Sequence, residues 1–280
     1  MRCAWQALVN LLPVWMRESV DRVGKDSLQE IHLRSNAPPE LVLASGPKYL
    51  ERCVTDEDLR FVVNVATRYS PWNATTTSHG FIAAPGGHRI GVCGHAVMDG
   101  EAVKGIHEIT SLCVRVARDL AGVSNGADDG CSSILVIGKP GSGKTTLLRD
   151  MIRSRSNMDL GNVSVVDEKE EIFPRAFNQM CFSVGQHTDI ISGCGKKTGI
   201  EMVLRNMNPS TIAVDEITAE EDCAALLHAG WCGVHLIATA HAGSKEDLLS
   251  RPVYKPLIQS RLFDYLIVMD QNKHWHREEL

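Results

Sequence analysis

A short segment beginning at residue 138 combines glycines, a lysine and hydroxyl side chains in a spacing that suits a chain of phosphates. It consists of Gly138, Lys139, Pro140, Gly141, Ser142, Gly143, Lys144, Thr145 and Thr146. An apolar run precedes it and a helical pattern follows it, so the glycines can turn consecutive N–H groups toward phosphate oxygens at a helix start. Lys144 would reach the β and γ phosphates of a nucleoside triphosphate, and the Thr145 hydroxyl would hold Mg²⁺. The segment is therefore predicted to be a P-loop.

A pair of carboxylates further along the chain supplies the second part of such a site. Asp215 and Glu216 directly follow the apolar run 211–214. Asp215 is expected to orient Mg²⁺ through the water shell of the ion, and Glu216 to polarise the attacking water as a general base. Two solvated acids after a core strand are the plain alternative, which the upstream P-loop disfavours. At the end of the apolar run 234–238, Thr239 or His241 is a candidate sensor of the γ-phosphate, with an ordinary polar strand end as an equal alternative.

Two further features favour ATP as the nucleotide. The strand-like run 163–166 lies between the P-loop and Asp215 in the sequence. This intervening strand favours the ATPase branch of P-loop proteins, which has an extra strand between the P-loop strand and the acidic strand. Asn272 and Lys273 resemble the start of a guanine-reading Asn-Lys-x-Asp motif, but Trp275 stands where the carboxylate would have to be. ATP with Mg²⁺ is therefore expected rather than GTP.

The chain is expected to form two domains, 1–125 and 126–280, with a linker of small, polar and turn-prone residues at 121–131. After the linker, nearly continuous apolar runs alternate with helical stretches, which predicts a mostly parallel sheet covered on both faces. These runs are 133–137, 163–166, 211–214, 234–238 and 265–269. The second domain is thus expected to be an α/β, RecA-like P-loop ATPase domain, and the first a smaller α+β domain.

Local signals in the first domain are those of a mixed α and β structure. Thr55 and Asp58 have the spacing of a helix capping box ahead of residues 59–69. Residues 80–93 predict a β-hairpin that turns at Pro-Gly-Gly. Further strands are expected at 30–34, 41–43 and 111–116.

Composition restricts the function classes. The 280-residue chain has a net charge of −5 and a pI near 6.1, which argues against a protein that coats nucleic acid. Its nine cysteines include no CxxC pair, which argues against a zinc site and for a reducing cytosol. No run reaches the length of a membrane span. The apolar residues 5–12 are expected to form an amphipathic helix rather than a secretory signal.

Motifs along most of the chain resemble one family. After the P-loop come Val165-Val166-Asp167-Glu168, Thr188-Asp189-Ile190, Val214-Asp215-Glu216-Ile217, Glu221-Asp222 and Ala238-Thr239-Ala240-His241. Before it come Glu30-Ile31-His32-Leu33-Arg34, Gly80-Phe81-Ile82 and residues 86–91 and 111–118. From about Leu11 to Gln271, the chain resembles the stage III sporulation protein AA family.

That family is similar to the hexameric ATPases of type II and type IV secretion. The resemblance implies a cytosolic homo-hexamer, peripheral to the inner face of the membrane, on the mother-cell side of an endospore-forming bacterium. There it would energise a secretion-like channel of membrane-embedded proteins, and no nucleic acid is expected as a partner. The resemblance also implies that Glu168 and His241 line the nucleotide site. Arg205 falls in a segment similar to the Leu-Arg-x-x-Pro-Asp stretch that precedes the acidic strand.

Two positions depart from the family pattern, because His187 and Ala219 stand where the family has arginines. Arginines near a phosphate stabilise transition-state charge. The remaining candidates are Arg205, Arg89, Arg115 and Arg118. Arg89 or Arg115 would act in trans on the γ-phosphate of a neighbouring subunit. Ordinary surface ion pairs are the alternative for each of them.

Two other functions stay open. One is a nucleotide-dependent scaffold that assembles with ATP and barely hydrolyses it. The other is a nucleic-acid translocase, which would need a basic channel.

Overall fold

The computed structural model describes residues 3–68, 80–100, 102–176 and 179–280. Two compact units are present: unit 1 comprises Met1–Asp119 and Pro174–Phe182, and unit 2 comprises Leu120–Phe173 and Ser183–Leu280. Unit 1 therefore takes in a segment from far along the chain, which no local sequence signal indicated. The expected domain boundary at 125/126 stays a prediction.

Unit 1 is built on antiparallel strands. Its helices are α1 (Trp5–Leu11), α2 (Val14–Val23) and α3 (Asp56–Thr67), with the 3₁₀ turn η2 (Pro85–Gly87). Its strands are β1 (Leu28–Arg34), β2 (Glu40–Leu43), β3 (Gly46–Tyr49), β4 (Phe81–Ala83), β5 (Arg89–Asp99), β6 (Ala102–Arg115), β9 (Arg175–Ala176) and β10 (Gln179–Met180). Six of these strands form one sheet in the order β3-β2-β1-β6-β5-β4, and β9 pairs with β10 separately.

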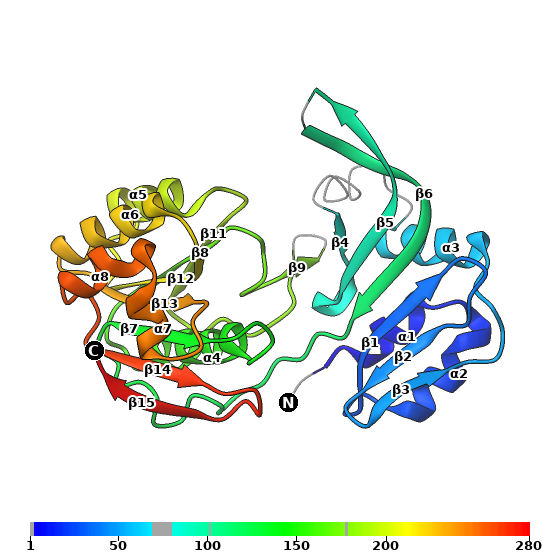
Figure 1. Ribbon diagram of the computed structural model, residues 1–280, viewed down its shortest axis with the longest axis horizontal. Helices are drawn as coiled ribbons and strands as arrows, with labels where there is room; N and C mark the ends of the chain where they lie inside the picture. The colour runs from blue at the N-terminus through cyan, green and yellow to red at the C-terminus, as the bar shows by residue number, and fades with distance from the viewer. Residues whose placement is uncertain (1–2, 69–79, 101, 177–178) are drawn as a thin grey trace. The chain divides into compact units, whose positions relative to one another are not determined.

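The core of unit 1 lies on one face of this sheet. Ile31 and Leu33 of β1, and Leu112 and Val114 of β6, are buried with apolar residues of the three helices. Because side chains alternate along a strand, the residues between them lie on the opposite face, which is only partly covered. The α+β character expected for this part of the chain, including its N-terminal helix, is confirmed (Figure 1).

Unit 2 alternates strands and helices. Its strands are β7 (Ile134–Gly138), β8 (Val163–Asp167), β11 (Thr188–Ser192), β12 (Thr211–Ile217), β13 (His235–Ala240), β14 (Tyr265–Met269) and β15 (Trp275–Glu279). Its helices are α4 (Lys144–Ser156), α5 (Lys196–Asn206), α6 (Glu220–Trp231), α7 (Lys245–Ser250) and α8 (Lys255–Gln259), with the 3₁₀ turn η3 (Pro252–Tyr254).

The seven-stranded sheet of unit 2 has the order β11-β8-β12-β13-β7-β14-β15. All its pairings are parallel except the antiparallel pair of β14 and β15. Every residue of β7, β8 and β14 is buried, as expected for strands covered on both faces. Helices α5 and α6 pack on one face, and α4 packs against the strands from the other (Figure 1). The carboxyl ends of β7, β12 and β13 therefore meet at one edge.

The extra strand expected between the P-loop strand and the acidic strand is present, and it is β13. The run 163–166, which intervenes in the sequence, forms β8 on the far side of β12.

Candidate nucleotide site

The predicted P-loop connects β7 to α4 and has a backbone that only glycine adopts easily. Gly141 and Gly143 have φ of +79° and +99°, in the left-handed region. A Cβ at Gly138 would lie 2.5 Å from the Ser142 hydroxyl, so a side chain there would force the loop to shift. The glycines of the motif are thus required by the path of the chain itself.

The start of α4 fits an anionic ligand. No described side chain caps its first turn, and that turn contains no acidic residue. The hydroxyl oxygen of Ser142 is buried and has no hydrogen-bond partner among the described residues. Free N–H groups and the positive end of the helix dipole favour an anion here. A phosphate chain would supply the missing acceptors.

Lys144 lies at the centre of the loop with its ammonium group held by three acceptors. Its Nζ donates to the carbonyl oxygens of Gly138 at 2.8 Å and Lys139 at 3.1 Å, and to Nδ1 of His241 at 3.1 Å. Burial lowers the pKa of Lys144, and the carboxylates of Asp215 and Glu216 oppose that shift. A negatively charged phosphate would be a stronger acceptor for this ammonium group than the neutral groups it now contacts.

Thr145, Asp215 and Thr239 form a chain of oxygen atoms suited to Mg²⁺. The Thr145 hydroxyl donates to Oδ2 of Asp215 at 2.7 Å, and the Thr239 hydroxyl donates to Oδ1 of the same carboxylate. Hydroxyl and carboxylate oxygens are the ligands that Mg²⁺ prefers. Thr145 and Asp215, from α4 and β12, are therefore brought together as the sequence predicted. Thr239 of β13 was expected only as a candidate γ-phosphate sensor at a strand end, and its hydrogen bond to Asp215 was not predicted.

Glu216 is held by a strained turn at the end of β12. Its φ is +50°, and the pairing of β12 with β13 shifts register between Val214 and Ile217. A positive φ in a residue other than glycine costs free energy and is frequent at functional sites. The backbone N–H of Glu216 donates to Oγ1 of Thr239 at 2.8 Å, so one hydroxyl fixes both acids.

The side chain of Glu216 is linked to the P-loop lysine through His241. Nε2 of His241 lies 3.0 Å from Oε1 of Glu216, and Nδ1 lies 3.1 Å from Nζ of Lys144. An ammonium group can only donate, so Nδ1 accepts and Nε2 carries the hydrogen that the carboxylate receives. His241 thus connects the candidate base to the loop that would hold the phosphates.

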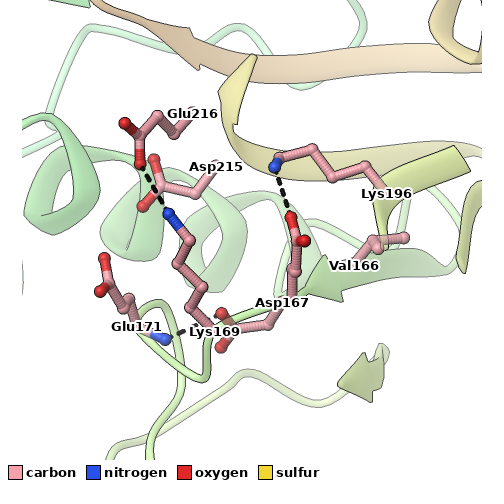
Figure 2. Close-up of a pocket in the computed structure, with 8 residues that line it drawn as sticks. Val166, Asp167, Lys169, Glu171, Lys196, Asp215 and Glu216 are labelled. Atoms are coloured by element: carbon pink, nitrogen blue, oxygen red, sulfur yellow. Dashed lines mark hydrogen bonds and ion pairs between the residues drawn. The ribbon is translucent and has the colours of Figure 1, made fainter. Parts of the chain in front are cut away.

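Two lysines complete the acidic end of the site, and neither carries a recognisable sequence motif. Nζ of Lys169 lies 3.5 Å from Oε2 of Glu216, and Figure 2 shows its side chain extending from the loop after β8 toward that carboxylate. Nζ of Lys196 lies 2.6 Å from Oε2 of Glu168 and 3.9 Å from Asp222. A small pocket is lined by both lysines and by the acids of β8 and β12.

Asp167 organises the loop that carries Glu168 and Lys169. Its carboxylate accepts backbone N–H groups of Glu171, Ile172 and Phe173 at 2.8–3.1 Å. Burial raises the pKa of Asp167, and these hydrogen bonds oppose that shift. Asp167 is thereby a positioning residue. Glu168 lines the pocket, and its place in the nucleotide site stays a prediction.

The arginines named as candidates do not join this cluster within one unit. Arg205 is exposed near the C-terminal end of α5, about 13 Å along the helix from Lys196. In unit 1, Arg89 stacks on the ring of Phe81 at 3.8 Å, and Nε of Arg115 lies 3.3 Å from Glu30. The position of Arg205 gives no support to a catalytic role.

The two positions where the family has arginines make other contacts. Nε2 of His187 lies 3.0 Å from the exposed carboxylate of Asp159. Ala219 precedes α6, and its N–H donates to Asp222. Neither position supplies a cation to the site.

Comparisons with known proteins agree with this geometry. The family model for "Sporulation stage III, protein AA" matches residues 5–277. This chain is a member of the sporulation stage III protein AA family. It is 33% identical to stage III sporulation protein AA of Bacillus subtilis (strain 168) over 95% of this chain and 91% of that protein. It is 29% identical to protein SEEDLING PLASTID DEVELOPMENT 1 of Arabidopsis thaliana, over 89% of this chain and 35% of that protein.

Two solved structures share the α/β, RecA-like fold of this family member. The Legionella pneumophila ATPase DotB matches with a TM-score of 0.57 and 16% identity, over 95% of this chain and 79% of that one. The pilus retraction motor PilT, solved with bound ADP, matches with a TM-score of 0.63 and 16% identity, over 90% and 76%. Among the described residues, no helix is long and apolar enough to cross a membrane.

Proposed function

We propose that this protein is a Mg²⁺-dependent ATPase that works as an oligomer. The proposal rests on the meeting of three strand ends. One carries the P-loop after β7, the second the two acids of β12, and the third Thr239 of β13 with His241 directly after that strand. Lysine, hydroxyl, carboxylate and candidate base are linked by hydrogen bonds in one network. Such a set is what hydrolysis of a phosphoanhydride requires.

The binding step follows from the contacts of the loop. The N–H groups at the uncapped start of α4 and the Ser142 hydroxyl would donate hydrogen bonds to the phosphate chain. The ammonium group of Lys144 would leave the carbonyl oxygens of the loop and donate to phosphate oxygens instead. Thr145 and Asp215 would hold Mg²⁺, which when bound neutralises the charge of the phosphates. The Thr145–Asp215 hydrogen bond shows that both groups already point to one place.

The hydrolytic step is assigned to Glu216. Its carboxylate takes the proton of the attacking water. The Thr239 hydroxyl holds the backbone N–H of Glu216, and His241 orients the carboxylate. Departure of Lys144 from His241 toward a γ-phosphate would leave the imidazole in contact with Glu216 alone. His241 would thereby couple the presence of that phosphate to the state of the base.

Family membership supports the biological setting. We place the protein in endospore formation, as a cytosolic homo-oligomer, hexameric by analogy, that energises a secretion-like channel of membrane proteins. Ordering of the loops around the γ-phosphate and their release after hydrolysis would drive movement.

Arg89 or Arg115 would complete the site of a neighbouring subunit. Mixing the Arg89→Ala variant with the Lys144→Ala variant tests action in trans, because recovery of activity in mixed rings supports it and no recovery at any ratio contradicts it.

The nucleotide site itself is tested by the Lys144→Ala variant. Binding of a non-hydrolysable ATP analogue with Mg²⁺, measured by calorimetry, should weaken at least about tenfold, or ~1.4 kcal/mol. The matched control is Lys255→Ala, which removes an exposed lysine of α8 in the same unit. Equal affinities of Lys144→Ala and the wild type would refute the assignment.

A scaffold that binds ATP and assembles without turnover is the second candidate. The contacts of His187 and Ala219, which bring no cation to the site, favour it. Nucleotide-dependent assembly that continues with no phosphate release in the wild type would select the scaffold over the ATPase.

A further inference from the structure

Three potential metal ligands lie together on the open face of the unit 1 sheet. Glu30 and His32 are two residues apart on β1, so they share a face, and Cys113 of β6 is the direct partner of His32 in the sheet register. One ligand atom from each side chain lies within 4.8 Å of the others. All three side chains are partly exposed rather than buried in the core.

The distances between the ligand atoms match those around a tetrahedral ion. Nε2 of His32 lies 3.2 Å from Oε2 of Glu30, and Sγ of Cys113 lies 3.8 Å from each of these atoms. With the usual zinc bond lengths, a tetrahedral ion would separate nitrogen and oxygen by about 3.4 Å and sulfur from either by about 3.6 Å. Shifts of about 0.2 Å would therefore seat an ion among them.

The guanidinium of Arg115 lies against two of these ligands. Its Nε is 3.3 Å from Oε1 of Glu30, and the side chain also hydrogen-bonds the Cys113 sulfur, so a bound ion has to displace the guanidinium from Cys113. On the other side of Cys113 the sheet partner is Gly91, which has no side chain to fill the space. A fourth coordination position can therefore be taken by water.

We propose that Glu30, His32 and Cys113 bind a thiophilic divalent transition ion, with Zn²⁺ as the best chemical fit. One nitrogen, one thiolate sulfur and one carboxylate oxygen suit Zn²⁺ and exclude Mg²⁺ and Ca²⁺ as the preferred ion. The bound ion would cross-link β1 to β6. The site shares no residue with the P-loop, and a bound ion there would run against the expectation, drawn from cysteine spacing, that no zinc site is present.

The test is titration of the purified full chain with Zn²⁺ and Co²⁺ in the presence of excess Mg²⁺, which occupies the Asp215 site. One ion per chain should bind, with a thiolate-to-cobalt charge-transfer band for Co²⁺. The Cys113→Ser and His32→Gln variants should lose more than about 100-fold in affinity, beyond what outer-shell changes cause. Zn²⁺ should also raise the melting temperature of the wild type and not of Cys113→Ser.

The matched control is Cys93→Ser, which removes an exposed cysteine of β5 in the same sheet and should leave binding unchanged. Absence of binding, or affinity unaffected by Cys113→Ser, would overturn the proposal. Binding that survives Cys113→Ser and disappears in His107→Ala would place the ion on the His95–His107 cross-strand pair. That result would also overturn the proposal.

Discussion

At the scale of single residues, the hydroxyl of Thr239 decides the geometry of the candidate site. It donates to Asp215 and accepts the N–H of Glu216 at 2.8 Å, and the side chain is fully buried. One small group thus orients both the expected metal ligand and the expected base. Partners of this kind contribute to activity without touching the substrate.

The Thr239→Val variant tests this positioning role. Valine keeps the volume and removes the hydroxyl, so Asp215 and the Glu216 amide each lose a partner. Phosphate release should fall about 10–100-fold, and half-maximal activity should need more Mg²⁺. Thr239→Ser retains the hydroxyl and should stay close to the wild type. An unchanged Mg²⁺ dependence in Thr239→Val would contradict the role.

A buried ion pair gives a second prediction for single side chains. Arg155 of α4 donates through Nε to Asp128 at 3.0 Å, and both side chains are almost completely buried. Asp128→Ala would leave an uncompensated guanidinium and should cost about 3–5 kcal/mol in the free energy of unfolding. The exposed Lys255→Ala variant, in a helix of the same unit, should cost less than about 0.5 kcal/mol. Similar denaturant midpoints for the two variants would show that the pair does not hold residues 121–131 to α4.

At the scale of elements, local spacing predicted those features whose partners are close in sequence. Thr55 and Asp58 form the capping box of α3, because a helix start needs acceptors within one turn. The hairpin of β4 and β5 formed where Pro-Gly-Gly indicated a turn. These contacts depend on the neighbouring residues and hardly on the rest of the fold.

His88 joins two elements of unit 1 and makes stability depend on pH. Its Nδ1 accepts the N–H of Ala117 at 3.0 Å, and Nε2 faces the carbonyl of Ala4 at 3.1 Å. Burial lowers the pKa of His88 below its ordinary value. The unfolded chain therefore binds this proton more readily, so stability falls as pH drops below about 6.5, toward the lower folded pKa.

The His88→Gln variant separates this contribution from general acid effects. Glutamine keeps a donor and an acceptor but does not titrate between pH 7 and 5. Urea unfolding midpoints should fall less on acidification in His88→Gln than in the wild type. Parallel pH profiles for the two proteins would rule out His88 as the titrating group.

At the scale of the whole molecule, the central strands were predictable and their neighbours were not. The runs that became β7, β8 and β14 are almost continuously apolar, which indicates strands covered on both faces. The edge strands β11 and β15 are only partly buried, so they left no such pattern. Sheet order also depends on packing between distant segments, which is why β13 rather than β8 separates the P-loop strand from the acidic strand.

The same distinction applies to the candidate site. Lys144, Thr145, Asp215 and Glu216 carry recognisable motifs, and the structure brings them together. Lys169 and Lys196 have no motif, since their partners are set by the positions of β8, β12 and α5. The Glu30, His32 and Cys113 cluster likewise depends on the register of strands far apart in the chain.

The proposed ATPase depends on Glu216 activating water at an ATP-loaded P-loop. The most direct test is phosphate release from ATP by the wild type and by Glu216→Gln, with binding of a non-hydrolysable analogue measured in parallel. Glu216→Gln should bind the analogue as tightly as the wild type and release phosphate at least about 100-fold more slowly, within the contribution expected of a general base. Equal rates of phosphate release from the two proteins would contradict the account.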